Sequence, residues 1–240
     1  MKNIEVKLLR YFEGESIIGA VAKCHDNKNA NMQLAENVVN VRHHDSITEH
    51  AVFQFDIIGI SRLCLQELVR HRMTSPTVKS TRYTLKPMIT DINELLSVKG
   101  CWTEDELMDL AEKYFVNPYN DPDENWDKDT VTRLKKSWLD DKFNVMKKLV
   151  EQKRIFDEIK EKGLNFPYKP NDYIKYSMNE SLRTELRLTI NLRSLRNFIN
   201  LRFNESAHFE IRHLAKLVKI LVDSTEYRNF VKNCGLNLDK

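Results

Sequence analysis

The sequence is poor in cysteine, and none of its cysteines forms a recognisable pair. The four residues, Cys24, Cys64, Cys101 and Cys234, are scattered and form no Cys-x-x-Cys motif. This argues against a structural zinc site and gives no reason to expect disulfides, so we expect a cytoplasmic protein. No run approaches the roughly 18 apolar residues that a membrane span needs. The start, MKNIEVKLLRYFEGES, lacks an uninterrupted apolar core and a cleavage site, so we expect no signal peptide.

The chain also lacks a strong excess of charge of one sign. Its net charge of +3 is too small to argue for a nucleic-acid partner. Internal repeats and low-complexity tracts are absent as well. The 240 residues, 41% hydrophobic and 30% charged, are typical of a soluble globular protein with one sizeable core or at most two small domains. Basic residues nevertheless cluster at 70–82 and 183–212.

Hydrophobic periodicity predicts both strands and helices. Alternating or β-branched stretches predict strands at 4–12, 51–60 and 186–191. Helical spacing predicts helices at 15–24, 31–40, 61 to about 75, 130–163, 194–202 and 206 to about 227. Ser61 is a candidate N-cap, and Pro76 is expected to end the third of these helices within a turn. Gly163 is expected to end the fourth.

The order of these elements is not strictly alternating, which favours an α+β fold. We expect a mixed sheet flanked by long helices, in one domain spanning 1–240. The charged segment at about 95–170 differs in character from the rest, and we expect it to be a helical insertion. It contains an acidic loop at 117–129.

Arg70, His71 and Arg72 form a first cluster, which Ser80 and Arg82 follow. Positive charge is favoured near the last carbonyls of a helix, so a basic C-cap is one interpretation. An anion site is the other, because a guanidinium binds phosphate through two parallel hydrogen bonds.

A second cluster lies in the loop His43-His44-Asp45-Ser46, followed by Thr48, Glu49 and His50. Three histidines beside two carboxylates suggest a metal site. The two adjacent histidines and the absence of a His-x-x-x-His pair on a helix argue against it. We therefore expect no metal, and we keep a capped turn with satisfied histidines as the simpler interpretation.

A third cluster follows the strand at 186–191. Arg193 and Asn197 are four residues apart and share a helix face opposite Leu195 and Phe198. A solvated polar face is the default interpretation. Asparagine is a poor helix former, however, and Asn191, Asn197 and Asn200 lie within ten residues. They indicate a task such as binding a heterocycle or a phosphate.

Together these segments resemble the flavin-dependent thymidylate synthase family. Arg70-His71-Arg72, seven residues and then Ser80 match its signature, which Arg82 and Tyr83 continue. The loop from His44 to His50 is similar to the family's His-x-Thr-x-x-x-Glu-His stretch, one spacer shorter, and the segment from Asn191 to Arg202 resembles its Asn-x-Arg-Ser-Leu-x-Asn-Phe-x-x-Leu-Arg helix. The matching segments cover about a third of the chain.

The resemblance implies a homotetramer with shared active sites that transfers a methylene group from methylenetetrahydrofolate to carbon 5 of dUMP. Electrons from NADPH pass through FAD, and no enzyme cysteine attacks the base; the Pro-Cys-His nucleophile of the cysteine-dependent synthases is indeed absent here. Arg202 and Ser80 are the implied catalytic residues, with Arg202 stabilising negative charge on the ring. The implied nucleotide-binding residues are Glu67, Arg70, Ser80, Thr81, Arg82, Lys175 and Arg202. The implied flavin-binding residues are His44, Ser46, Glu49, Arg70, His71, Arg72, Asn191, Arg193 and Asn197.

The chain departs from the family mainly on the nucleotide side. Glu67 stands where the family has Gln, Thr77 and Val78 stand where it has Asn-Glu, and Lys175 falls on or near a family Arg. Because a carboxylate can accept from a cytosine amino group, a second hypothesis is methylation or hydroxymethylation of another pyrimidine such as dCMP.

Three hypotheses that assign the chain to other classes of protein remain open at this point. A nucleic-acid-binding module would use the same arginines in salt-sensitive binding. The helix at 130–163 could support a coiled coil, although its apolar stripe is short and mixed. A metal-dependent hydrolase would use the histidine loop.

Overall fold

The computed structural model describes residues 4–98, 102–120 and 125–235. Cys101 and part of the predicted acidic loop, 121–124, lie outside this range. The described chain forms two compact units. The sheet unit comprises residues up to 60, together with 64–78 and 185–235, and the helical unit comprises 61–63 and 79–184.

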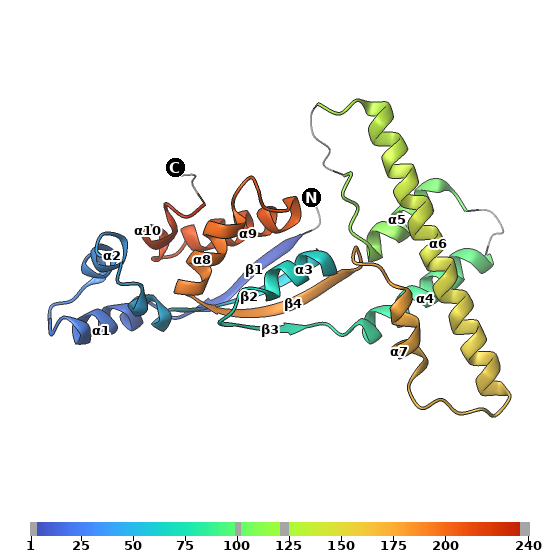
Figure 1. The fold of residues 1–240 in the computed structure, drawn as a ribbon, viewed down its shortest axis with the longest axis horizontal. Helices are drawn as coiled ribbons and strands as arrows, with labels where there is room; N and C mark the ends of the chain where they lie inside the picture. The colour runs from blue at the N-terminus through green and yellow to red at the C-terminus, as the bar shows by residue number, and fades with distance from the viewer. Residues whose placement is uncertain (1–3, 99–101, 121–124, 236–240) are drawn as a thin grey trace. The chain divides into compact units, whose positions relative to one another are not determined.

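Four strands form the sheet, in the order β1-β2-β4-β3 (Figure 1). They are β1 (Glu5–Tyr11), β2 (Val52–Ser61), β3 (Thr74–Val78) and β4 (Arg183–Asn191). β1 pairs with β2, and β3 with β4, in antiparallel register. Side chains paired across β2 and β4, Gln54 with Thr189 and Asp56 with Arg187, run in opposite order along the two strands, so this pair is antiparallel too.

The predicted α+β class is confirmed, with one correction. The sheet is antiparallel at each of these pairings, where a mixed sheet was expected. The order of elements leaves strand direction open, because β4 follows more than a hundred residues of intervening chain and could return in either direction.

One face of the sheet is buried, as the alternation of apolar residues predicted. Phe53, Phe55 and Ile57 of β2 and Leu186, Leu188 and Ile190 of β4 are at most 4% exposed. The helices α8 (Leu192–Arg202) and α9 (Phe209–Asp223) supply the other side of this core (Figure 1). Their inward residues include Leu195, Phe198 and Ile199, as predicted. Burying each such side chain stabilises the fold by about 1.5–3 kcal/mol.

The remaining elements of the sheet unit largely follow the sequence prediction. They are α1 (Glu15–Cys24), α2 (Met32–Asn40), the 3-10 helix η1 (Asp45–His50), α3 (Arg62–Val69), which begins at the edge of the helical unit, and α10 (Arg228–Val231). The last long helix is α9, and it is shorter than expected.

The third predicted helix ends earlier than expected. α3 stops at Val69, not near Pro76, and residues 74–78 form β3 in place of a turn. β3 lies at the edge of the sheet, where a proline without an N–H is tolerated. Pairing with β4 therefore outweighs the local preference for a turn.

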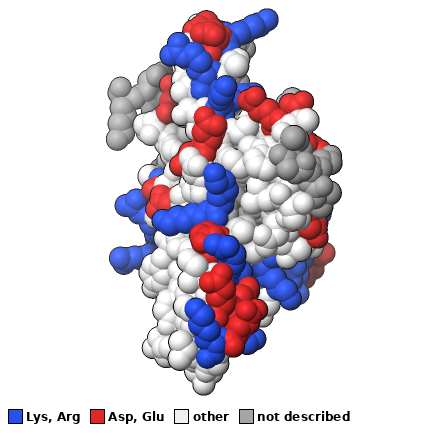
Figure 2. Space-filling view, turned by 90° about the vertical axis from the view of Figure 1, so that its right-hand side faces the viewer, with Lys and Arg blue, Asp and Glu red and all other residues white. Residues whose placement is uncertain are grey.

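The helical unit contains α4 (Thr81–Val98), α5 (Glu104–Tyr114), α6 (Lys128–Glu161), α7 (Pro170–Ile174) and the 3-10 helix η2 (Lys175–Ser177). α6 matches the predicted long amphipathic helix and is followed by Gly163 at φ 74°. It buries Trp138, Leu139, Met146 and Leu149, while its other face carries interspersed acidic and basic side chains (Figure 2). No prediction had been made for α4. Within the described residues no helix combines the length and apolarity needed to cross a membrane.

Candidate functional site

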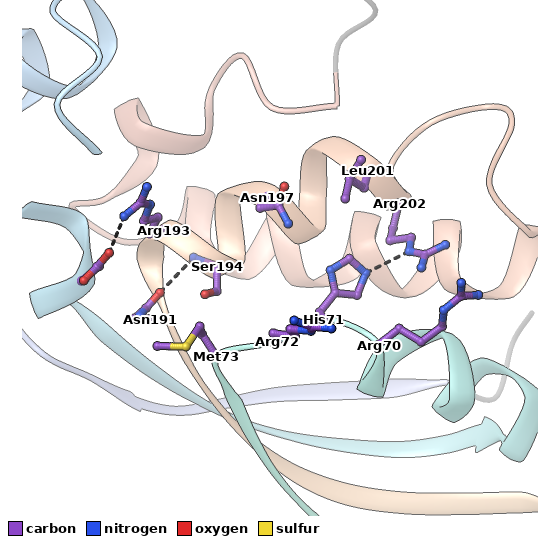
Figure 3. A pocket seen from close by; sticks show the side chains of 11 residues that line it. Arg70, His71, Arg72, Met73, Asn191, Arg193, Ser194, Asn197, Leu201 and Arg202 are labelled. Carbon is purple, nitrogen blue, oxygen red and sulfur yellow. Dashed lines mark hydrogen bonds and ion pairs between the residues drawn. The ribbon is translucent and has the colours of Figure 1, made fainter. Parts of the chain in front are cut away.

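A pocket of about 560 Å³ opens in the sheet unit where the end of α3 meets α8 (Figure 3). Ligand sites typically measure about 300–1,000 Å³, so the pocket is large enough for a nucleotide-sized group. Its lining combines residues from all three sequence clusters, the first and third of which are more than a hundred positions apart. They are Glu49, Arg70, His71, Arg72, Met73, Asn191, Arg193, Ser194, Asn197, Leu201 and Arg202.

The basic side of the pocket is built by a tight connection between α3 and β3. After Val69 the N–H of His71 donates to the carbonyl of Leu68. The hydroxyl of Thr74 then donates to the carbonyl of His71 at 3.0 Å. Met73 between them adopts φ 62°, a left-handed conformation that is uncommon for a non-glycine residue. Backbone strain of this kind is concentrated at functional sites. Here the left-handed conformation of Met73 lets the chain turn within four residues.

His71 is the buried member of this connection, at 8% exposure. Its ring meets Phe198 edge-on, with ring centroids 5.1 Å apart. Its Nε2 accepts a hydrogen bond of 2.9 Å from Nε of Arg202 (Figure 3). Burial lowers the pKa of His71, and the positive charge of Arg202 lowers that pKa further. The ring is therefore neutral at pH 7 and serves as an acceptor.

Arg202 is held at a second point by Glu67. Nη1 of Arg202 lies 2.7 Å from Oε2 of Glu67, and Nη1 of Arg70 lies 3.2 Å from its Oε1. Glu67 is not among the lining residues of the pocket, whereas both arginines are. The carboxylate, which the resemblance implied as a nucleotide-binding group, is paired with two arginines that line the pocket.

The opposite wall is the first turns of α8. Asn191 is the N-cap of this helix, and its side chain accepts a 2.9 Å hydrogen bond from the N–H of Ser194. Arg193 forms an ion pair with Glu49 of η1 (Figure 3). Asn197 is exposed and also lines the pocket. Asn200 does not belong to this wall, because its side chain accepts from the N–H of Gly235.

Three lining residues were not predicted as site residues: Met73, Ser194 and Leu201. A signal for Leu201 was available, because it lies four residues after Asn197 and is therefore on the polar face of α8. It is 56% exposed although it is apolar. Met73 carried no such signal, since its position depends on a backbone conformation that the sequence does not reveal.

Two predicted flavin-binding residues lie outside the pocket lining. His44 and Ser46 are exposed, at the start of η1. η1 itself is tied to α8, because Asp45 pairs with Arg196 in addition to the Glu49 pair. Among the described residues no three His, Cys, Asp or Glu side chains gather as a metal site would require.

The other predicted nucleotide-binding residues belong to the helical unit. Ser80 is exposed just before α4, and Thr81 Oγ1 accepts a 3.2 Å hydrogen bond from Arg62. Nε of Arg82 lies 2.6 Å from Oδ1 of Asp172, and Nζ of Lys175 lies 3.3 Å from the same oxygen. The hydrogen bond from Arg82 lowers the pKa of Asp172 below its usual range. Arg82 and Lys175, separated by 93 positions in the sequence, thus share one carboxylate.

The sheet-unit pocket is electropositive even after its ion pairs are counted. Arg70 and Arg202 pair with the carboxylate of Glu67, and Arg193 pairs with that of Glu49. Arg72 adds a fourth guanidinium, so two positive charges remain in excess. The Arg72 side chain has no ion pair or hydrogen bond within the described part of the chain. Such a pocket is suited to a ligand with a phosphate and a polar heterocycle.

Comparisons with known proteins agree with this chemistry. A family model described as thymidylate synthase complementing protein matches residues 7–224. The flavin-dependent thymidylate synthase of Campylobacter jejuni is 37% identical over 185 residues, 76% of this chain and 71% of the relative. That of Wolinella succinogenes is 36% identical over 184 residues, 77% of this chain and 72% of the relative.

A solved structure is similar as well. The crystal structure of Thymidylate Synthase X from Helicobacter pylori with FAD and dUMP covers 97% of this chain and 99% of its own, at 28% identity and a TM-score of 0.66. The family model spans most of the chain, and each of the three motifs that carried the resemblance supplies residues to the pocket lining. The chain therefore belongs to the thymidylate synthase complementing protein family, together with the flavin-dependent thymidylate synthases.

Proposed function

We propose that this protein is a flavin-dependent thymidylate synthase, which converts dUMP to dTMP. In this reaction methylenetetrahydrofolate supplies the one-carbon unit and NADPH supplies electrons through FAD. The observation that carries the proposal is the pocket in which Arg70, His71 and Arg72 meet Arg193 and Arg202. Family membership and the relatives' names support it.

The pocket residues fit a flavin nucleotide by their chemistry. Arg72 and Arg193 offer planar donors for a diphosphate, and Asn191 and Asn197 offer amide groups for a heterocycle. Met73 and Leu201 add apolar surface on which a flat ring can rest. When bound, FAD would supply the redox chemistry, while the protein binds and orients the reactants.

Arg202 is the residue for which we propose a direct catalytic role. Carbon 5 of a pyrimidine becomes nucleophilic only when negative charge on the ring is stabilised. A guanidinium held by His71 and Glu67 is oriented before the substrate binds, so it stabilises that charge without reorganising. His71 is neutral and buried, so it orients Arg202 without adding a second charge.

For the residues of the helical unit the proposed roles rest on the sequence resemblance. Ser80, as the second catalytic residue, and Thr81, Arg82 and Lys175 are proposed to serve the nucleotide. His44 and Ser46 remain proposed flavin-binding residues on the same basis. We also propose that residues 1–240 act as one functional domain with a helical insertion at about 95–170, in a cytoplasmic homotetramer; light scattering after gel filtration tests the tetramer.

The proposal is tested by the purified protein and its cofactor. We expect flavin absorbance bands, directly or after FAD is added back, and dTMP formation that requires dUMP, NADPH and methylenetetrahydrofolate together. A colourless protein that neither binds added FAD nor forms dTMP would contradict the proposal. Salt-sensitive binding to DNA in such a protein would instead favour the nucleic-acid-binding alternative.

A further inference from the structure

Glu67 pairs with two arginines that line the pocket, although it is not itself among the lining residues. Its two carboxylate oxygens are divided between them, Oε1 to Arg70 at 3.2 Å and Oε2 to Arg202 at 2.7 Å. Arg70 follows the end of α3, and Arg202 is the last residue of α8. One carboxylate therefore ties together two guanidinium groups from distant parts of the sequence.

The two arginines differ in how firmly they are held. The side chain of Arg202 is 20% exposed, and that of Arg70 is 71% exposed. Arg202 is bound by Nε to the His71 ring and by Nη1 to the Glu67 carboxylate, and its Nη2 also donates to the main-chain carbonyl of Glu67 at 3.5 Å. Two contacts at different corners determine the direction of a planar group. The remaining N–H groups of Arg202 are thus aimed before any ligand arrives.

The carboxylate also changes the charge at this end of the pocket. Two guanidinium groups and one carboxylate carry a single positive charge between them. A phosphate is bound best by guanidinium groups that are free to form paired hydrogen bonds with it. A pyrimidine ring instead requires oriented N–H donors toward its carbonyl oxygen and only modest positive charge.

We propose that Glu67 is a positioning and specificity-determining residue, which orients Arg202 and removes one positive charge so that this end of the pocket takes a pyrimidine ring and disfavours a phosphate. The inference rests on the proposed function, because the ring belongs to its substrate. It assigns to Glu67 an action through Arg70 and Arg202, without direct contact with the nucleotide.

Three variants separate the charge of Glu67 from its reach. Glu67→Gln removes the charge and keeps the size, and Glu67→Asp keeps the charge and shortens the reach. Glu151→Gln is the matched control, because Glu151 forms a 2.8 Å pair with Arg154 on the exposed surface of α6. Circular dichroism and the melting temperature establish that each variant is folded.

The first measurement is the affinity for inorganic phosphate, by titration calorimetry on the protein without nucleotide. We expect Glu67→Gln to bind phosphate about tenfold more tightly than the wild type, because a like charge has been removed. We expect the phosphate affinity of Glu67→Asp and of Glu151→Gln to stay within about twofold of the wild type. The first variant retains the negative charge beside the pocket, and the second changes only an exposed residue of α6. Equal phosphate affinity in Glu67→Gln and the wild type would overturn the charge assignment.

The second measurement is turnover of dUMP. Misplacing a catalytic group by about 1 Å can cost about 100-fold, so we expect kcat to fall by about 10- to 100-fold in both Glu67 variants, with KM changing by less than about threefold. Wild-type kcat in Glu67→Asp would overturn the orienting role, and this variant decides it even if Glu67→Gln does not fold. If the wild type itself makes no dTMP, the proposed function fails, while the phosphate titration still decides the charge assignment.

Discussion

Arg202 donates from its Nε to Nε2 of His71 over 2.9 Å, and this hydrogen bond joins two residues 131 positions apart in the sequence. Because Nε2 accepts, the neutral ring carries its proton on Nδ1. Protonation of His71 would turn the acceptor into a donor beside a guanidinium. The bond therefore makes the direction of Arg202 dependent on the protonation state of its neighbour.

Lowering the pH should weaken the fold partly through His71. Its pKa in the folded protein lies below the ordinary value of 6.5, first through burial and then through Arg202. The unfolded chain therefore binds the proton more readily, so this stability is present above about pH 6.5 and is lost as the pH falls through the folded pKa. We expect the free energy of unfolding, from denaturant titrations at pH 7, 6 and 5, to fall less steeply in His71→Gln.

His213 contributes to the same slope, because burial lowers its pKa as well. The His71 variant should therefore reduce the pH dependence without removing it, and His213→Gln is the comparison variant. An identical slope in the wild type and His71→Gln would show that His71 titrates alike in the folded and unfolded chains.

Arg202→Lys should abolish most of the turnover of dUMP while leaving the affinity for FAD nearly unchanged. The ammonium of lysine lacks the planar fork, so it cannot donate to His71 and to the ring from fixed directions. Loss of an oriented charge-stabilising donor typically costs about 100- to 1,000-fold in kcat. FAD binding, followed by flavin fluorescence, should remain within about threefold, since other guanidinium groups line the pocket.

Arg187→Lys is the control for that experiment. Arg187 makes two 2.8 Å hydrogen bonds to Asp56 on the exposed face of the sheet, outside the pocket lining. It should keep wild-type turnover. Equal losses in both variants would mean that a general loss of arginine side chains, and not the position of Arg202, explains the effect.

Alanine variants of Asn191 and Asn197 should distinguish an effect on the stability of the fold from an effect on FAD binding. Asn191 caps α8 and lines the pocket, so Asn191→Ala should lose about 1 kcal/mol of unfolding free energy and also bind FAD more weakly. Asn197 is exposed, and its side chain has no hydrogen bond within the described residues, so Asn197→Ala should weaken FAD binding with little change in stability. Denaturant titration and FAD titration measure the two effects. Unchanged FAD affinity in Asn197→Ala would remove this residue from the flavin site.

The enzyme should prefer dUMP to dCMP. Both carboxylate oxygens of Glu67 already accept from Arg70 and Arg202, which leaves the carboxylate poorly placed to attract a cytosine amino group. We expect kcat/KM for dUMP to exceed that for dCMP by at least about tenfold, measured with each nucleotide alone and in competition. The reverse preference would favour the alternative activity on cytosine nucleotides.

Local sequence patterns predicted much of the sheet unit. Alternation placed Leu186, Leu188 and Ile190 on one face, and helical spacing placed α1, α2 and α8 close to their observed bounds. β3 was missed because Pro76 signals a turn when only its neighbours are considered. The strand exists because β4 offers it partners at the sheet edge, and such pairing is not visible in local sequence.

The sequence by itself determined which residue types could bind a phosphate and a heterocycle, because motif spacing places Arg193 and Asn197 on one helix face and Arg70 to Arg72 at a helix end. The flavin was implied by the family resemblance. Only the tertiary structure decided that His71 and Glu67 both hold Arg202. Spacing defines neighbours along a single helix or strand. Contacts between residues more than a hundred positions apart depend on how α8 packs against the end of α3, and therefore on the whole core of the sheet unit.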